Sequence, residues 1–183
     1  MLVIVTGPDK AGKTTLCTHL AKALNMNYIK CVRPKNHEQL VGTVFHLINN
    51  PPKESTIIDR WYYPEDLIYE PIMSGNVSEL VSYQGVIEHS LKKLGVLYLY
   101  VYANEPTLRK RWELVGDEYL TPDRLPYLLK EYHNFYNGTS LSMIPIDTTD
   151  MTPEDTFRRA ASCISSWTIQ RYVEQNPSLR GTD

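Results

Sequence analysis

The residues with the most specific chemistry lie in the first fifteen positions of the chain, where residues 7–14 read GPDKAGKT. This segment fits the pattern G-x-x-x-x-G-K-[ST] in full. An apolar run at residues 2–5 precedes it, and a stretch with apolar residues at helical spacing follows it. Glycines let the backbone N–H groups of such a loop turn toward an anion, and the following helix adds partial positive charge at its N-terminus. We therefore expect the loop to bind a nucleoside triphosphate, with Lys13 on the β- and γ-phosphates and the Thr14 hydroxyl on Mg²⁺.

The other residues of this phosphate loop are assigned to the same nucleotide, which we expect to be ATP acting together with Mg²⁺. The predicted nucleotide contacts in and after the loop are Gly7, Ala11, Gly12, Lys13, Thr14 and Thr15. The motif alone does not identify the reaction, because translocating ATPases, GTPase switches and small-molecule kinases all share it.

A second group of chemically active residues is Asp59, Arg60 and Trp61, which end a short apolar run. In a parallel sheet the carboxyl ends of the strands meet at one edge, so this group is expected near the phosphate loop. A carboxylate there can hold Mg²⁺ or accept a proton, and the planar fork of an arginine can clamp an acceptor phosphate. The alternative is a surface Asp–Arg pair with Trp61 in the core.

Taken together, these motifs resemble those of the thymidylate kinases and their relatives, the deoxynucleoside kinases. The loop is similar to the thymidylate kinase form G-x-D-R-x-G-K-[ST], and residues 59–61 resemble that family's D-R-[YH]. The resemblance implies that Asp9 binds the 3′-hydroxyl of an acceptor deoxyribose, that Arg60 binds the acceptor monophosphate and that Asp59 assists Mg²⁺. Lys10 stands where one branch of the family has an arginine that bridges the two phosphates; it keeps the charge but lacks the bidentate fork.

Three further segments extend the resemblance. Arg33 lies where the family has an R-E-P segment, here without the Glu, and Tyr83 with Gln84 resembles a Y-Q-G of bacterial thymidylate kinases. The basic run that contains Arg109 and Arg111 resembles a mobile lid of about residues 109–121, whose arginines would close over the transferring phosphoryl group. The non-functional alternatives are that the basic run at Arg109 and Arg111 is a solvated helix face and that Tyr83 is an ordinary aromatic residue of a helix.

From these motifs and the resemblance we predict a complete site. The catalytic residues would be Lys13, Arg60, Asp59, Lys10 and Arg111, with Arg109 as a further nucleotide contact and Thr14 and Asp59 on the metal. The acceptor would be contacted by Asp9, Arg33, Arg60, Trp61, Tyr83 and Gln84.

The acceptor itself stays open between two chemistries. A deoxynucleoside kinase must deprotonate a 5′-hydroxyl, and relatives place a glutamate for this just after the second strand, where this chain has Arg33-Pro34-Lys35. A monophosphate kinase needs no strong base but does need cations. We therefore favour transfer to a pyrimidine deoxynucleoside monophosphate, dTMP to dTDP first. The alternative is a deoxynucleoside kinase with Glu38 or Asp59 as the base.

Two other functional classes are kept beside these kinases. A nucleotide-gated switch or binding module would need a partner that responds to the lid, although an N-K-x-D motif typical of GTPases is not found. A kinase acting on a modified base within DNA is disfavoured by the formal charge of −2, because binding to a polymeric nucleic acid relies on a basic surface.

The elements that must position these residues alternate along the chain. Apolar runs at residues 2–5, 28–32, 56–59, 96–102 and 143–147 read as strands. Helical spacing is found at residues 14–24, 38–48, 65–73 and 77–94, and further helices are expected to begin near Pro106, Pro122 and Pro153. This alternation predicts an α/β fold with a five-stranded parallel sheet and helices on both faces. With the resemblance, it is expected to be a P-loop kinase fold with a lid segment.

Composition sets the remaining limits. The 183 residues, 42% hydrophobic and 22% charged, are typical of a single globular domain, here residues 1–183, and exclude general disorder. No segment approaches the roughly 18 apolar residues of a membrane helix, and the apolar start is too short for a signal sequence. Three widely spaced cysteines suit a reducing cytoplasm. The expected partner is a small nucleotide, and relatives are often homodimers.

Overall fold

A computed structural model of the chain describes residues 1–31, 37–116 and 121–176. Its strands form one parallel sheet in the order β2-β3-β1-β4-β5, which confirms the predicted α/β class and strand number. The strands are β1 (Leu2–Thr6), β2 (Asn27–Lys30), β3 (Thr56–Asp59), β4 (Leu97–Tyr102) and β5 (Met143–Asp147). The α-helices are α1 (Lys13–Ala23), α2 (His37–Asn49), α3 (Tyr62–Met73), α4 (Gln84–Leu94), α5 (Glu105–Val115), α6 (Leu125–Gly138) and α7 (Pro153–Gln175).

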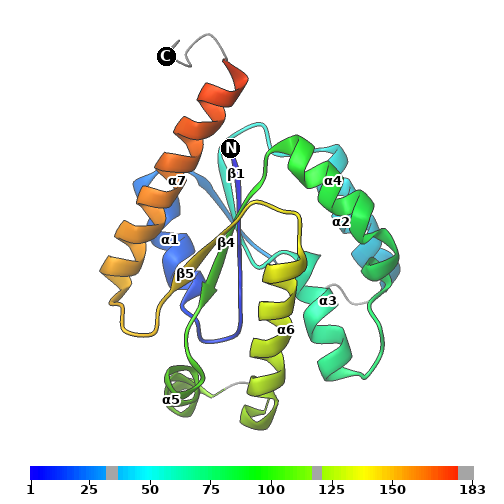
Figure 1. Ribbon diagram of the computed structural model, residues 1–183, viewed down its shortest axis with the longest axis vertical. Helices are drawn as coiled ribbons and strands as arrows, with labels where there is room; N and C mark the ends of the chain where they lie inside the picture. The colour runs from blue at the N-terminus through cyan, green and yellow to red at the C-terminus, as the bar shows by residue number, and fades with distance from the viewer. Residues whose placement is uncertain (32–36, 117–120, 177–183) are drawn as a thin grey trace.

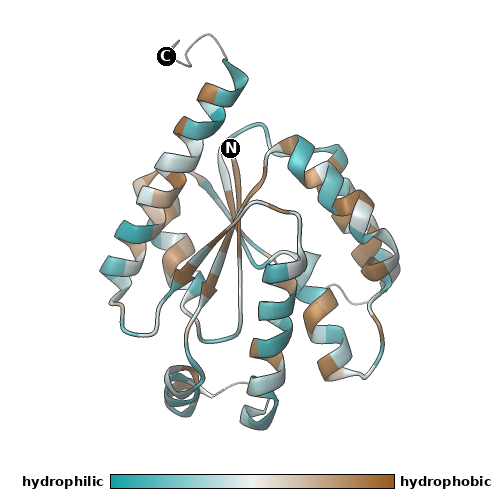
Figure 2. Cartoon of the chain, viewed as in Figure 1, coloured by the Kyte–Doolittle hydropathy of each residue, from teal (hydrophilic) through white to brown (hydrophobic). Residues whose placement is uncertain are grey.

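Helices cover both faces of the sheet. In Figure 1, α1 and α7 lie on one side, and α2, α3, α4 and α6 lie on the other. Successive side chains of a strand point to opposite faces. The odd-numbered residues Val3 and Val5 accordingly belong to the same core cluster as α1 and α7, whereas Leu2 and Ile4 pack with α2 and α4. Because both faces are covered, the central strands are apolar along their length, as the brown strands of Figure 2 show.

The position of β1 decides where the functional groups lie. It is the central strand and is buried along all five residues, and the phosphate loop leaves from its carboxyl end. Its neighbour β3 is in a register that pairs Val5 with Asp59. Asp59 therefore lies beside the end of β1, next to the start of the phosphate loop, as expected from the strand pattern.

Several element boundaries differ from the sequence-based expectation. One helix was expected over residues 77–94, but this is wrong, because a 3₁₀-helix, η1 (Glu79–Tyr83), precedes α4. Ser78 causes the tight start, since its hydroxyl accepts from the Leu80 amide and donates to Asp66. Helix α3 has a kink at Tyr63, whose φ of −109° and ψ of 120° are not helical, so its regular part begins close to the expected residue 65. Strand β2 ends at Lys30, before the expected residue 32. A second short 3₁₀-helix, η2 (Pro122–Arg124), leads into α6.

No helix in the described part of the chain is both long and apolar enough to cross a membrane.

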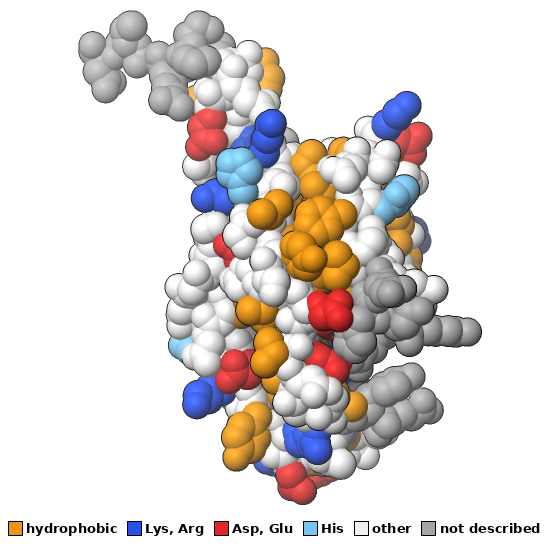
Figure 3. Space-filling model, turned by 90° about the vertical axis from the view of Figure 1, so that its right-hand side faces the viewer, with side chains coloured by type: hydrophobic (Ala, Val, Ile, Leu, Met, Phe, Trp, Pro, Cys, Tyr) orange, Lys and Arg blue, Asp and Glu red, His pale blue; other side chains and the backbone are white. Residues whose placement is uncertain are grey.

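Hydrophobic side chains gather on the face that carries α2, α3 and α4 (Figure 3). The exposed large ones on η1 and α4 are Val81, Tyr83, Val86 and Leu94. A homodimer remains a prediction.

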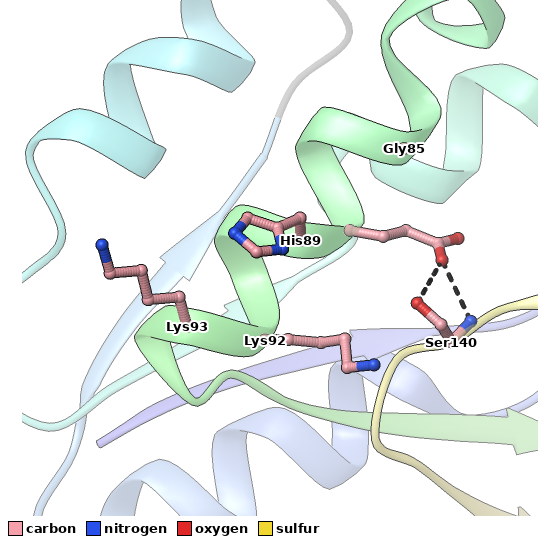
Figure 4. Close-up of a pocket in the computed structure, with 6 residues that line it drawn as sticks. Gly85, His89, Lys92, Lys93 and Ser140 are labelled. Atoms are coloured by element: carbon pink, nitrogen blue, oxygen red, sulfur yellow. Dashed lines mark hydrogen bonds between the residues drawn. The ribbon is translucent and has the colours of Figure 1, made fainter.

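A buried carboxylate, Glu88, joins α4 to α3 and to the turn before β5. It accepts hydrogen bonds from the hydroxyls of Tyr63 (2.7 Å) and Thr139 (2.8 Å), and from the amide and hydroxyl of Ser140 at 3.0 and 2.7 Å. Figure 4 shows Ser140 at this contact, beside a cavity of about 460 Å³ that α4 lines with His89, Lys92 and Lys93. Burial alone raises the pKa of Glu88, but the hydrogen-bond donors outweigh burial and hold the pKa below its usual value.

Replacing Glu88 with alanine is expected to lower the free energy of unfolding by about 3 kcal/mol, because several buried donors lose their acceptor. Urea denaturation measures this loss, with the exposed Glu174→Ala as a control that should change little.

A carboxylate with a lowered pKa stabilises the fold above its ordinary pKa and loses that effect as the pH falls. The stability difference between the native chain and Glu88→Gln should therefore shrink below about pH 4. A loss for Glu88→Ala no larger than for the control would contradict this role.

Candidate active site

The phosphate loop joins β1 to α1 with two glycines in unusual backbone conformations. Gly7 has φ +138° and Gly12, the residue before α1, has φ +94°. A Cβ at Gly7 would also overlap the carbonyl of Val101 in the neighbouring strand. Glycine at position 7 is therefore required both by conformation and by close packing. Ala11, Thr14 and Thr15 lie in the loop and the first turn of α1, where the helix N-terminus adds partial positive charge.

Lys13 is buried within the curve of its own loop. Its Nζ donates to the carbonyls of Gly7 at 2.5 Å and Pro8 at 2.6 Å, and the residue is 3% exposed. Burial is the main cause that lowers the pKa of Lys13 to about 8, and the nearby Arg60 charge adds to it. Neighbouring carboxylates oppose the shift, so Lys13 is mostly protonated at neutral pH.

Asp59 is fully buried between the loop and the edge strand. The Thr14 hydroxyl donates to its Oδ2 at 2.6 Å, and the Tyr28 hydroxyl donates to the same oxygen at 3.0 Å. Its Oδ1 is buried and has no hydrogen-bond partner among the described residues. An unpartnered carboxylate oxygen beside a hydroxyl is a donor set that suits a hard cation such as Mg²⁺. Thr14 and Asp59 therefore fit the predicted metal site.

Arg60 forms an ion pair with Asp9, the third residue of the phosphate loop. Its backbone amide donates to the Val5 carbonyl at 3.0 Å, and its φ of +60° lies in the left-handed region that a non-glycine residue rarely adopts. Asp9 also accepts a hydrogen bond from the Tyr69 hydroxyl at 2.8 Å. Strain of this kind persists when surrounding contacts hold it, and it is frequent at functional sites.

The charges of this pair support each other. Burial alone raises the pKa of Asp9, but Lys13 and Arg60 outweigh burial and hold it below its usual value. Burial alone lowers the pKa of Arg60, but Asp9 and Glu65 outweigh it and raise the pKa. Both side chains are therefore charged at neutral pH.

Of the basic run on α5, one arginine reaches the loop. Arg111 donates to the Thr148 carbonyl at 2.7 Å, to the Thr148 hydroxyl at 3.1 Å and to the Lys10 carbonyl at 3.2 Å. Arg109 instead pairs with Glu105 on the previous turn at 2.7 Å. The Lys10 ammonium lies 5.9 Å from the ring centroid of Trp112. The predicted lid overlaps α5 and continues into residues 117–120, which lie outside the described part of the chain.

The predicted acceptor residues are only partly brought together. Asp9 and Arg60 meet, whereas Trp61 is 2% exposed and belongs to the core cluster with α2 and α4. Tyr83 packs edge-on against Phe45, with ring centroids 5.6 Å apart. Gln84 donates to Glu88 at 3.3 Å. Arg33 lies outside the described residues.

Four side chains beside the site were not predicted to have a role there: Tyr28, Glu65, Tyr132 and Thr148. Glu65 and Tyr69 lie one helical turn apart on α3, directly after Arg60, so their i, i+4 spacing was a usable signal. Tyr132 and Thr148 reach the site from distant segments. The described residues contain no cluster of three or more His, Cys, Asp or Glu side chains that could hold a metal.

Comparison with known proteins finds relatives of the same architecture. No family model matches the chain. It is 25% identical over 157 residues to the SPbeta prophage-derived uncharacterized protein YorR of Bacillus subtilis (strain 168), covering 80% of this chain and 88% of YorR. A crystal structure of YorR in complex with phosphorylated GDP matches with a TM-score of 0.76 at 22% identity, covering 90% of this chain and 96% of YorR.

Solved kinases with different acceptors share the fold. Deoxyadenosine kinase from M. mycoides matches with a TM-score of 0.62 at 15% identity, covering 91% of this chain and 99% of that one. Thymidylate kinase from Candida albicans matches at 0.59 and 14%, covering 90% and 91%. A gluconokinase from Sinorhizobium meliloti matches at 0.64 and 13%, covering 94% and 95%. The P-loop kinase fold is thus confirmed, while the specific resemblance to thymidylate kinases is not.

Nucleotide binding is expected to take up a proton at alkaline pH. With a pKa of about 8, Lys13 is neutral in about three quarters of the unbound protein at pH 8.5, and bound phosphates favour its charged form. Calorimetry of ADP binding in buffers of different ionisation enthalpy should show about 0.7 protons taken up at pH 8.5 and far fewer through Lys13 at pH 6.5. Affinity should fall as the pH rises between these values.

The control for this experiment is Lys13→Arg, since a guanidinium stays protonated throughout this range. It should abolish the alkaline uptake. Equal uptake by both proteins at pH 8.5 would assign the proton to another group.

Proposed function

We propose that residues 1–183 form one kinase domain that transfers the γ-phosphoryl group of ATP to a pyrimidine deoxynucleoside monophosphate, with dTMP as the first candidate. The observation that carries this proposal is the ion pair between Arg60 and Asp9. This ion pair places Arg60, which is expected to bind the acceptor phosphate, against the loop that is expected to bind the donor nucleotide. Donor and acceptor phosphates bound there would meet end to end.

The donor side is assigned to the loop and its neighbours. The loop amides and Lys13 bind the β- and γ-phosphates, while Thr14 and Asp59 hold Mg²⁺, which when bound neutralises phosphate charge. Arg111 is held at the loop by the carbonyls of Thr148 and Lys10, and we assign its guanidinium to the transferring group. Arg109 would follow as a secondary contact.

On the acceptor side, Arg60 binds the monophosphate and Asp9 binds the 3′-hydroxyl of the sugar. Lys10, Arg33, Tyr83 and Gln84 complete this half of the site. Trp61 contributes from the core, by supporting Arg60, rather than by stacking on a base. Each opposite-charge pair at about 4 Å is worth about 4 kcal/mol at an intermediate dielectric, so two or three can offset phosphate repulsion.

The similar proteins support nucleotide chemistry. A solved structure of YorR holds phosphorylated GDP, and a solved deoxyadenosine kinase holds dCMP and dCDP. The gluconokinase shows that the fold also serves other acceptors.

A deoxynucleoside kinase is the second candidate, because Asp9 already neutralises Arg60 and Glu65 adds negative charge beside it. An uncharged 5′-hydroxyl acceptor would suit such a balance, with Asp59 or Glu38 as the base.

The acceptor is tested by measuring ADP release from ATP and Mg²⁺ with a panel of deoxynucleosides and deoxynucleoside monophosphates, with gluconate included. Stimulation at least tenfold by dTMP or another pyrimidine monophosphate is expected. Stimulation by nucleosides alone would establish the second candidate. Slow release unaffected by every acceptor would favour a nucleotide-gated switch and overturn the kinase.

Arg60→Ala is expected to raise the KM for the monophosphate and to lower kcat about 100-fold, because the acceptor phosphate loses its charge-assisted hydrogen bonds. The KM for ATP should change much less. Lys13→Ala is the companion variant, since it should abolish transfer while a thermal melt still shows a folded protein. Equal effects of Arg60→Ala on both substrates would refute the acceptor assignment.

A further inference from the structure

A third carboxylate, Glu65, lies at the carboxyl end of the central strand and is not part of the predicted site. Its Oε1 accepts a hydrogen bond from the Thr6 hydroxyl at 2.8 Å, and its Oε2 accepts one from the Tyr132 hydroxyl at 2.6 Å. Thr6 belongs to β1, Tyr132 to α6 and Glu65 itself to α3, so the position of this carboxylate is fixed by contacts among three elements. Three ion pairs are found among the described residues, and Glu65 belongs to none of them.

Its hydrogen bond to Thr6 places the carboxylate beside the loop that holds the buried Lys13 and beside the backbone of Arg60. The residue before Thr6, Val5, accepts from the Arg60 amide, and the residue after it, Gly7, accepts from the Lys13 ammonium. Glu65 favours the charged forms of both Lys13 and Arg60 through space. An unpaired negative charge is thus fixed beside the two cations expected to bind phosphates.

We propose that Glu65 is a built-in counter-anion that competes with bound phosphates for the charge of Lys13 and Arg60. This inference rests on the proposed function and deepens its account of the site. Ground-state affinity for both nucleotides is limited by this competition, and the products, which keep their phosphates on the same cations, leave faster. Tighter binding of substrate and product alike does not raise kcat, and it slows turnover when release is limiting.

The charge is tested with Glu65→Gln, which keeps the shape and one acceptor oxygen. At pH 6.5, where Lys13 is protonated, we expect ADP to bind about fivefold more tightly than to the native protein. In steady state, the KM for the acceptor should fall and kcat should fall with it. A residue with only a structural role would instead weaken binding or leave it unchanged when removed, and either result would overturn the proposal.

Two control variants separate charge from hydrogen bonding and from burial. Tyr132→Phe removes a hydrogen bond but keeps the carboxylate, so it should not tighten ADP binding as Glu65→Gln does. Glu88→Gln neutralises another buried carboxylate held by tyrosine, threonine and serine hydroxyls, away from the phosphate loop. It should lower stability without tightening ADP. Equal tightening in either control would refute a specific charge effect of Glu65.

The test remains decisive if Glu65→Gln is destabilised or if the acceptor assignment is wrong. The rise in melting temperature caused by a fixed ADP concentration, measured from each variant's own baseline, reports affinity even if Glu65→Gln melts early. A larger rise than native supports the proposal, and an equal or smaller one overturns it. ADP binding needs no acceptor, so a negative acceptor panel would remove the proposed function alone. Normal transfer with unaltered ADP affinity in Glu65→Gln would remove this inference alone.

Discussion

Mutual compensation of buried charges at the end of β1 is the constraint on which the rest of this structure depends. Lys13, Asp9 and Asp59 are nearly or fully buried, and Arg60 packs against Asp9. A buried charge is tolerated when opposite charges and hydrogen bonds surround it, and removing one partner exposes the cost of the other. The left-handed backbone of Arg60 follows from this requirement, because it turns the chain sharply enough to direct the guanidinium back over the phosphate loop. The strain is held by the hydrogen bond from Arg60 to Val5 and by the ion pair.

The parallel sheet makes this compensation possible. Its register sets Asp59 level with Val5, so the carboxylate at the end of β3 meets the Thr14 hydroxyl in the first turn of α1. Helix α3 then starts two residues after Arg60 and carries Glu65 and Tyr69 back toward the same point. The layers of the fold thus deliver side chains from separate segments of the chain to one edge, as expected for ligand sites in open α/β sheets.

Features with a local cause were predictable from the amino-acid sequence. The phosphate loop combines glycine conformations, a lysine and a helix start within eight residues, and Asp59–Arg60 gains meaning from the strand before it. By contrast, Tyr132 and Thr148 lie far along the chain from their partners, and only the packed fold brings them to Glu65 and Ala11. The expected helix over 77–94 failed for a different reason. Its apolar spacing suits a helix, but the Ser78 hydroxyl stabilises a tighter start, and a side-chain hydrogen bond can override periodicity.

The balance of charge bears on which acceptor the site can take. Within the described residues, the cations near the loop are Lys10, Lys13, Arg60 and Arg111, and the carboxylates are Asp9, Asp59 and Glu65. That excess is small against two phosphate-bearing ligands, which repel each other strongly at close range. A monophosphate acceptor therefore requires further positive charge, which the proposed function assigns to Mg²⁺ and to Arg33. An uncharged nucleoside would need less. Because Lys13 and Arg60 are already shared with Asp9 and Glu65, the free positive charge of the site, rather than its shape, separates the two acceptor classes.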